Sequence, residues 1–300
     1  MRLPLLFVAF ALPVALAASY QSPLRIRPQA ASTAAGNAGA LGSPADEIPR
    51  RLDLVAREYG YAGPSKVAAG RRVISLRNEG KALHHVQLVQ LSDNKQVSDL
   101  LVALNQDPHV TKLPGWATLV GGPSAALPGA TIESEVQLSA GRYVVLCWIP
   151  NAEGAPHYMK GMLMPFDVVD AGRDPAPTTG PLSTVLVREY GFTFYPPATP
   201  GRRTLRVENI GSQPHEFLIV RLQPGVNVEQ VASWSEKGQV GQAPVERWVG
   251  VAALAPGKSA QLTLDFEPGR YAVFCLSPDR ADGRAHLEHG MHRTFEIAGA

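Results

Sequence analysis

The feature that most constrains the fold of this 300-residue chain is an internal repeat that covers most of its length. The sequence Arg-Glu-Tyr-Gly occurs at residues 57–60 and returns 131 positions later, at residues 188–191. The sequence Gly-Arg-Tyr, followed by a Cys, occurs at residues 141–147 and again at residues 269–275, a spacing of 128. A nearly constant spacing of this size indicates duplication of a whole domain, because short stacked repeats have periods of about 20–50 residues.

Within each copy, apolar and polar residues alternate, as they do along residues 205–208 and 262–266. This period of two is typical of strands with one face buried. One short helix is expected in each copy, at Val97–Leu104 and at Val228–Trp234. Short strands separated by Gly and Pro turns predict an all-β chain built from two tandem Greek-key sandwiches or barrels. We place the first at residues 46–170, a Pro-rich linker at 171–181, and the second at 182–300.

The N-terminus resembles an export signal. Arg2 precedes an apolar stretch from Leu3 to Leu16, and Ala15-Leu16-Ala17 is a small-x-small cleavage site. We expect residues 1–17 to be removed and residues 18–45, rich in Ala, Gly and Ser, to form a flexible tether. A membrane anchor is the alternative, but the apolar stretch is short for a span. The protein is therefore expected in a periplasm or outside the cell, with no membrane span in the mature chain.

Composition excludes some classes of partner. The formal net charge is +2, and the Lys and Arg residues do not cluster in one run. Nucleic-acid binding therefore has no electrostatic support. The hydrophobic fraction of 45% is enough to build a core in each copy.

Each copy carries a His, a Cys, a second His and a Met in the same order. The first set is His84, Cys147, His157 and Met162, and the second is His215, Cys275, His286 and Met291. Nine or ten residues separate each Cys from its downstream His, and four separate that His from the Met. A thiolate, two imidazoles and a weak thioether suit copper in both of its common oxidation states.

These motifs carry a family resemblance. Asn-x5-His, then Gly-x-Tyr-x3-Cys, then His-x3-Gly-Met resembles the cupredoxin (blue, type 1 copper) family, of the plastocyanin and azurin kind. The resemblance covers about residues 50–170 and 182–298. It implies β-sandwiches that carry electrons, with one copper held by the first set of four residues and a second copper by the other set.

The chain also departs from that family. The loop from Cys to His is longer than in plastocyanin-like proteins and closer to the type 1 loop of copper nitrite reductases. The residue after the first His is often small and polar in the family, but here it is His85 or Glu216. Leu83 stands where the second copy has Pro214. These differences leave the hydrogen bonding around the sulfur, and hence the redox potential, open.

An enzymatic alternative follows from the doubled domain, because two-domain cupredoxins include nitrite reductases and small oxidases. Those enzymes need further histidines for a second copper centre, commonly one before the Cys and others in His-x-His pairs. Here Leu146 and Phe274 precede the cysteines, and no His-x-His pair exists. The spare histidines are His85, His109, His289 and His292. Most of them are expected to be solvated surface residues, with a weak secondary metal site as the alternative.

Several candidate ligands have simpler interpretations. Cys147 and Cys275 could be inert core thiols or could form a disulfide. The methionines could only fill gaps in the core. Met159 competes with Met162, and His289 competes with His286. Tyr143 and Tyr271 are expected to pack in the core, and Trp148 either to pack or to shield a metal.

The sequence thus predicts an exported copper-binding protein with two mononuclear type 1 sites that passes electrons between redox partner proteins. Alternatives are a copper-handling or storage protein and a metal-free interaction module with a cupredoxin-like fold. A two-domain oxidase or nitrite reductase is disfavoured by the missing histidines.

Overall fold

The computed structural model describes residues 48–92, 94–107, 112–171 and 182–299. The expected signal peptide, the tether, His109 and almost all of the linker lie outside the described residues. We call residues 48–171 the first module and residues 182–299 the second module. The predicted domain boundaries themselves stay a prediction.

The first module contains these elements: β1 (Arg51–Arg57), β2 (Gly60–Ala62), β3 (Lys66–Ala68), β4 (Gly70–Asn78), β5 (Gln87–Leu91), α1 (Val97–Gln106), β6 (Ala117–Leu119), β7 (Thr131–Leu138), β8 (Gly141–Leu146), the 3-10 helix η1 (His157–Lys160) and β9 (Leu163–Val169). The second module contains β10 (Leu182–Arg188), β11 (Gly191–Tyr195), β12 (Gly201–Asn209), β13 (His215–Leu222), α2 (Val228–Glu236), β14 (Val245–Leu254), β15 (Ser259–Phe266), β16 (Gly269–Phe274), the 3-10 helix η2 (His286–His289) and β17 (His292–Ile297).

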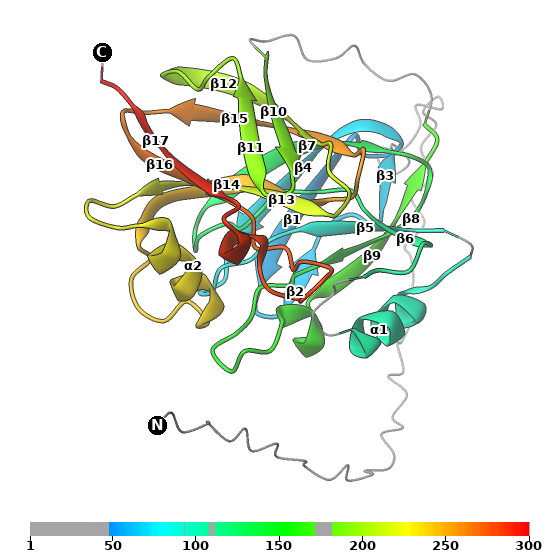
Figure 1. Ribbon diagram of the computed structural model, residues 1–300. Helices are drawn as coiled ribbons and strands as arrows, with labels where there is room; N and C mark the ends of the chain where they lie inside the picture. Colours follow the sequence, from blue (N-terminus) through cyan, green and yellow to red (C-terminus); the bar gives the residue numbers. More distant parts are fainter. Residues whose placement is uncertain (1–47, 93, 108–111, 172–181, 300) are drawn as a thin grey trace, which may run out of the picture. The chain divides into compact units, whose positions relative to one another are not determined.

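The predicted all-β class is confirmed, and the sequence repeat reappears as a repeat of elements (Figure 1). β1 pairs in parallel with β4, and β10 pairs in parallel with β12 in the same way. The predicted helices form at α1 and α2 and run two residues further than expected. α2 begins with a reciprocal cap, since Asn227 Oδ1 accepts from Gln230 N at 2.9 Å and Gln230 Oε1 accepts from Asn227 N. No helix among the described residues is long and apolar enough to cross a membrane.

The core lies between the sheets. The strands form one eight-stranded sheet, a four-stranded sheet (β14-β13-β16-β17) and a five-stranded sheet (β3-β9-β8-β5-β6). Tyr143 and Tyr271 are buried as predicted, and their hydroxyls donate to the carbonyls of Ser139 and Glu267. Each ring therefore packs in the core without leaving an unpaired hydroxyl.

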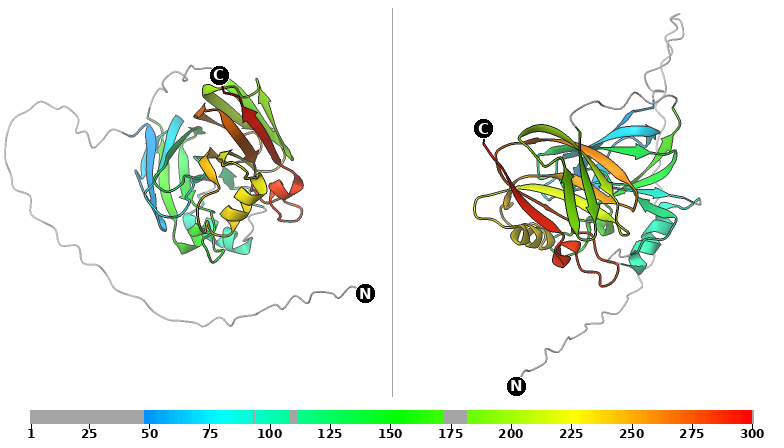
Figure 2. Two further views of the ribbon diagram at one scale, coloured as in Figure 1. Left: turned by 90° about the vertical axis from the view of Figure 1, so that its left-hand side faces the viewer. Right: turned by 45° about the horizontal axis from the view of Figure 1, so that its top comes forward.

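The eight-stranded sheet joins the two modules, in the order β11-β10-β12-β15-β7-β4-β1-β2. Figure 2 shows the first module, coloured blue to green, beside the second, coloured yellow-green to red. The joint is an antiparallel pairing of β15 with β7, where Ala260 faces Val136 and Gln261 faces Glu135. The sequence predicts two separate sandwiches, so the shared sheet is a difference from that expectation. It has a physical reason: each sandwich would otherwise expose a strand edge with unpaired backbone groups.

A second contact between the modules is also made by backbone hydrogen bonds. Residues 119–124 of the first module run beside β14 of the second. Gly121 N donates to Ala253 O at 3.1 Å, and Ala252 N donates to Gly122 O at 2.9 Å. The buried side chain of Gln87 reaches across and donates to Ala253 O at 3.0 Å. The interface therefore has strand-like order over its described length.

Two glycines allow the backbone to approach closely at equivalent places in the modules. Gly122 has φ +124°, and a Cβ atom there would lie 2.4 Å from Val86 O. Gly250 has φ +155°, and its Cβ would lie 2.2 Å from Phe217 O. No real Cβ fits at such distances, so both positions require glycine.

We predict that Gly122→Ala lowers the free energy of unfolding of the copper-free protein by about 2 kcal/mol or more, because the clash is with backbone. Gly115→Ala is the matched control, since a Cβ at that position would meet no atom within 4 Å, and it should change stability by about 0.5 kcal/mol or less. Urea denaturation measures both. Equal stability of the two variants would contradict this assignment.

Candidate metal centres

The structure brings together the first predicted donor set. His84 Nδ1 and His157 Nδ1 lie 3.2 Å apart, and Cys147 Sγ lies 3.5 Å from His157 Nδ1. The three donor atoms all lie within 4.8 Å of one another, and the three side chains are buried. Donors bound at about 2.0–2.3 Å around a trigonal metal would be about 3.5 Å apart. The first centre therefore has the dimensions of a metal site.

The second donor set has almost the same geometry. His215 Nδ1 and His286 Nδ1 lie 3.0 Å apart, and Cys275 Sγ lies 3.5 Å from His286 Nδ1. These donor atoms also lie within 4.8 Å of one another and are buried. The two modules thus build the same constellation independently.

Backbone hydrogen bonds fix the downstream ligands relative to the cysteine. Cys147 directly follows β8, and its N–H donates to Met162 O at 3.2 Å. Met162 N in turn donates to His157 O, and Tyr158 N donates to Cys147 O. The equivalent bonds are present in the second module, where Cys275 N donates to Met291 O at 3.3 Å. These bonds therefore hold the two ends of the long Cys-to-Met loop together in each module.

Burial and position distinguish the competing candidate residues. Met162 and Met291 are fully buried, whereas Met159 is 46% exposed. His286 belongs to the donor set, while His289 lies beside Asp282, with 3.2 Å between Nε2 and Oδ1. The axial role of the two methionines stays a prediction.

Both cysteines are free and buried, so the disulfide alternative is wrong for this structure. Burial raises the pKa of Cys147 to about 12, and burial followed by the nearby Glu216 charge raises the pKa of Cys275 to about 12. Without a metal, both groups are protonated thiols at neutral pH. Binding of a metal would therefore release a proton from each.

The downstream histidines are neutral at physiological pH. Burial, together with the neighbouring first histidine, lowers the pKa of His157 and of His286 to about 4. A neutral imidazole keeps a lone pair for a metal, which a protonated ring lacks. The electrostatics of both centres thus favour the ligating form of the ring.

The repeated Arg-Glu-Tyr-Gly motif orients the first histidine of each centre. Glu58 Oε1 accepts the N–H of Ala82 at 2.8 Å and lies 3.4 Å from His84 Nε2. Glu189 Oε1 lies 3.3 Å from His215 Nε2 and accepts the N–H groups of the loop just before it. A carboxylate on the second ring nitrogen of a ligating histidine fixes its tautomer and orientation. Sequence reasoning found this repeat but assigned it no role.

The tyrosine of the same motif covers the downstream histidine. The Tyr59 ring meets His157 edge-on with 5.0 Å between ring centroids, and Tyr190 meets His286 in the same way at 5.6 Å. A Cβ at Gly80 would lie 2.5 Å from Glu58 Oε1 and 2.7 Å from His84 Nε2, so a larger residue there would disturb this contact. The repetition of Arg-Glu-Tyr-Gly at the same spacing as the ligand sets was the sequence feature that could have revealed these residues.

The repeated asparagine clamps the loop that carries the first histidine. Asn78 Nδ2 donates to Ala82 O and Ala126 O at 2.8 Å, and its Oδ1 accepts from Gly80 N. Asn209 makes the three equivalent bonds in the second module. A buried amide that satisfies three backbone groups makes this loop rigid.

The surroundings of the two sulfur atoms differ. His85, predicted to lie at the surface, is only 5% exposed, and its Nδ1 lies 3.3 Å from Cys147 Sγ. His85 is buried because it lies two residues before β5, where the two modules meet. In the second module the backbone N–H of Glu216 donates to Cys275 Sγ at 3.3 Å. Burial raises the pKa of the Glu216 carboxyl to about 7.

The second centre carries one extra carboxylate. Asp279 is 2% exposed, lies 3.5 Å from His286 Nε2, and accepts from the Tyr190 hydroxyl at 2.7 Å. That hydrogen bond holds the pKa of Asp279 well below its usual range. The equivalent residue in the first module is the neutral Asn151, whose Oδ1 accepts from Glu153 N and Ala155 N.

The chain was compared with protein families, curated proteins and solved structures. No protein-family model and no curated protein matches the chain. Among solved structures, an auracyanin from Roseiflexus castenholzii is 17% identical and covers 41% of this chain and 99% of its own, with a TM-score of 0.31. A multicopper oxidase is 15% identical over 85% of this chain and 91% of its own, with a TM-score of 0.26.

A copper-containing nitrite reductase from Thermus scotoductus is 14% identical over 84% of this chain, with a TM-score of 0.24, and the match spans 62% of that enzyme. The donor geometry of this chain, and not these similarities, supports the metal sites.

We predict a change in acid stability for the double variant Glu58→Gln/Glu189→Gln. Although burial opposes it, backbone N–H groups lower the pKa of both carboxyls to about 2. Their stabilisation is present above the unfolded value of about 4.3 and is lost as pH falls toward 2. The free energy of unfolding of the copper-free variant should therefore fall less steeply between pH 5 and pH 2. Denaturant titrations measure it, with the exposed Glu296→Gln as control, and a slope equal to the wild-type slope would refute it.

Proposed function

We propose that each centre binds one copper ion and that the protein is an electron carrier with two mononuclear type 1 sites. One observation carries the proposal: in equivalent places of one chain, two buried sets of two imidazoles and one thiol bring their donor atoms within 4.8 Å of one another. His84, Cys147, His157 and Met162 would hold the first ion. His215, Cys275, His286 and Met291 would hold the second.

The donor chemistry fits copper better than zinc or iron. When bound by two imidazoles, a thiolate and a thioether, copper supplies a one-electron carrier. The chain orients the first imidazole of each centre through Glu58 and Glu189, so little has to move there when the charge changes. Water is excluded because His84, Cys147 and His286 are buried.

The other metal-binding side chains near the two donor sets favour electron transfer over catalysis. In the described part of the chain, the one further group of three close His, Cys, Asp or Glu side chains is Asp279, Asp282 and His289. Asp279 already accepts from Tyr190 and from Gln213. A second copper centre of the kind that oxidases and nitrite reductases need therefore finds no histidine cluster among these residues.

The physiological setting is also proposed. An exported carrier would work in a periplasm or outside the cell and would exchange electrons with redox partner proteins. Support comes from the apolar N-terminal stretch with its small-residue cleavage site.

Copper stoichiometry with a visible spectrum tests the proposal. The purified chain should bind two copper ions and be intensely blue, with narrow copper hyperfine splitting. Cys147→Ser and Cys275→Ser should each bind one tightly held ion and lose roughly half of the blue absorption. A folded wild-type protein that stays colourless after copper is added would refute the proposal. More than two copper ions per chain would favour an enzyme. Blue sites that do not cycle reversibly would favour copper storage.

The two centres should differ in redox potential, and a reciprocal pair of variants tests the cause. Asp279 adds a negative charge beside the second centre, which stabilises the more oxidised ion. Asp279→Asn should raise the potential of the second centre by roughly 40–90 mV, the equivalent of about 1–2 kcal/mol for one electron.

Asn151→Asp is the matched change in the first module and should lower the potential of the first centre. Redox titration in the Cys147→Ser or Cys275→Ser background follows one centre at a time. Potentials that do not respond, or that shift in the opposite direction, would show that this charge does not set the difference.

A further inference from the structure

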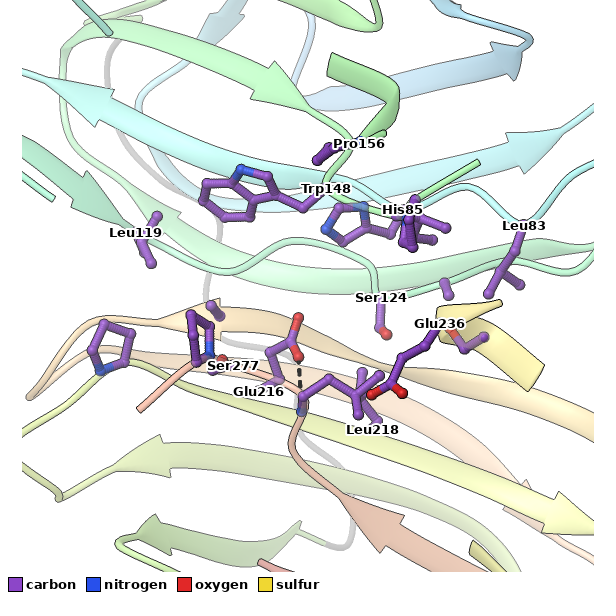
Figure 3. A pocket seen from close by; sticks show the side chains of 18 of the residues that line it. Leu83, His85, Leu119, Ser124, Trp148, Pro156, Glu216, Leu218, Glu236 and Ser277 are labelled. Atoms are coloured by element: carbon purple, nitrogen blue, oxygen red, sulfur yellow. Dashed lines mark hydrogen bonds between the residues drawn. The ribbon is translucent and has the colours of Figure 1, made fainter. Parts of the chain in front are cut away.

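A cavity of about 300 Å³ lies between the two modules, next to both candidate centres. His85 and Trp148, the neighbours of His84 and Cys147, line it from the first module. Glu216 and Leu276, the neighbours of His215 and Cys275, line it from the second. Figure 3 shows His85 and Trp148 on one wall and Glu216 with Leu218 on the facing wall. No sequence pattern indicates this cavity, because it forms only where the modules meet.

The walls are mainly apolar. Leucine, isoleucine, proline and alanine side chains make most of the lining, and the Trp148 indole adds a broad flat surface. A dry cavity of about 150 Å³ holds a benzene molecule, so twice that volume fits one ring with a short side chain. Size and polarity therefore favour a small organic molecule over water alone.

The charged groups of the lining are all acidic. Glu216 lies inside and Glu236 lies on α2, and no Lys or Arg of the described residues lines the cavity. Glu216 Oε2 accepts from Leu276 N at 3.2 Å, and the described residues give its other oxygen no hydrogen bond and the carboxyl group no ion pair. An unpaired carboxylate against apolar walls is costly, and a bound cation would offset that cost.

A metal ion is a poor match for this cavity. His85, Glu216 and Glu236 do not form a close donor group among the described residues. His85 is also turned toward Cys147, with 3.3 Å between Nδ1 and Sγ. The cation must therefore be one that a single carboxylate and an apolar wall can hold.

We propose that this cavity binds a small organic cation, an amine whose ammonium group pairs with Glu216 and whose ring-sized apolar body lies against Trp148 and the surrounding leucines and prolines. A carboxylate ligand would face two like charges, and a neutral ligand would leave Glu216 unpaired. The proposal does not depend on copper, because every group that it uses belongs to the chain.

Calorimetry with three molecules of nearly equal shape tests the site: 2-phenylethylammonium, 2-phenylethanol and phenylacetate. We expect the wild-type protein to bind the ammonium compound most tightly, the alcohol at least about tenfold more weakly, and the anion not measurably. Glu216→Gln keeps the shape and an acceptor for Leu276 N but removes the charge. It should weaken binding of the ammonium compound at least about tenfold and leave the alcohol almost unchanged.

Glu296→Gln is the control. It also removes one negative charge, but Glu296 is exposed on β17 and does not line the cavity, so this change should not alter binding. Titrations on copper-loaded and copper-free protein separate this proposal from the proposed function, because ammonium binding in both forms supports the cavity whether or not copper binds. No binding of the ammonium compound, equal binding of the alcohol, or binding unaffected by Glu216→Gln would overturn it.

Discussion

Burial of two imidazole–thiol sets inside apolar cores is the constraint on which the rest of the structure depends. Each set brings polar atoms into a place where unpaired polar groups are costly. The chain offsets part of that cost with fixed partners: Glu58 and Glu189 on the far ring nitrogens, and Asn78 and Asn209 on the loop before the histidine. The Nδ1 and Sγ atoms of each set face one another, and this is where a metal would bind.

The joining of the modules follows from a different requirement. Each sandwich has an edge strand, β7 or β15, and pairing the two covers part of each edge. The same packing places the segment around Gly122 beside β14 and leaves a space between the residues that follow the ligands. The two centres thus lie beside one interface and have the same backbone framework. Their surroundings differ at two equivalent positions, where the first module has His85 and Asn151 and the second has Glu216 and Asp279.

Much of the fold and most of the donor set could be predicted from the sequence, because both depend on local periodicity and on a repeat. The alternation along residues 205–208 and the Cys–His–Met spacing carry that information directly. The shared sheet, the burial of His85 and the cavity could not be predicted. Each arises from contact between residues far apart in the chain, for which one sequence has no local signal. Asp279 was missed for a related reason, since its role depends on lying 3.5 Å from His286 Nε2.

X-ray absorption at the copper edge of the loaded protein tests the central claim most directly, because it reports the atoms bound to the metal. Our account predicts, for each ion, two nitrogen neighbours at about 2.0 Å and one sulfur at roughly 2.2–2.3 Å. The sulfur signal should disappear from one centre in Cys147→Ser and from the other in Cys275→Ser. A spectrum of nitrogen and oxygen neighbours alone, with no short sulfur distance in the wild-type protein, would contradict it.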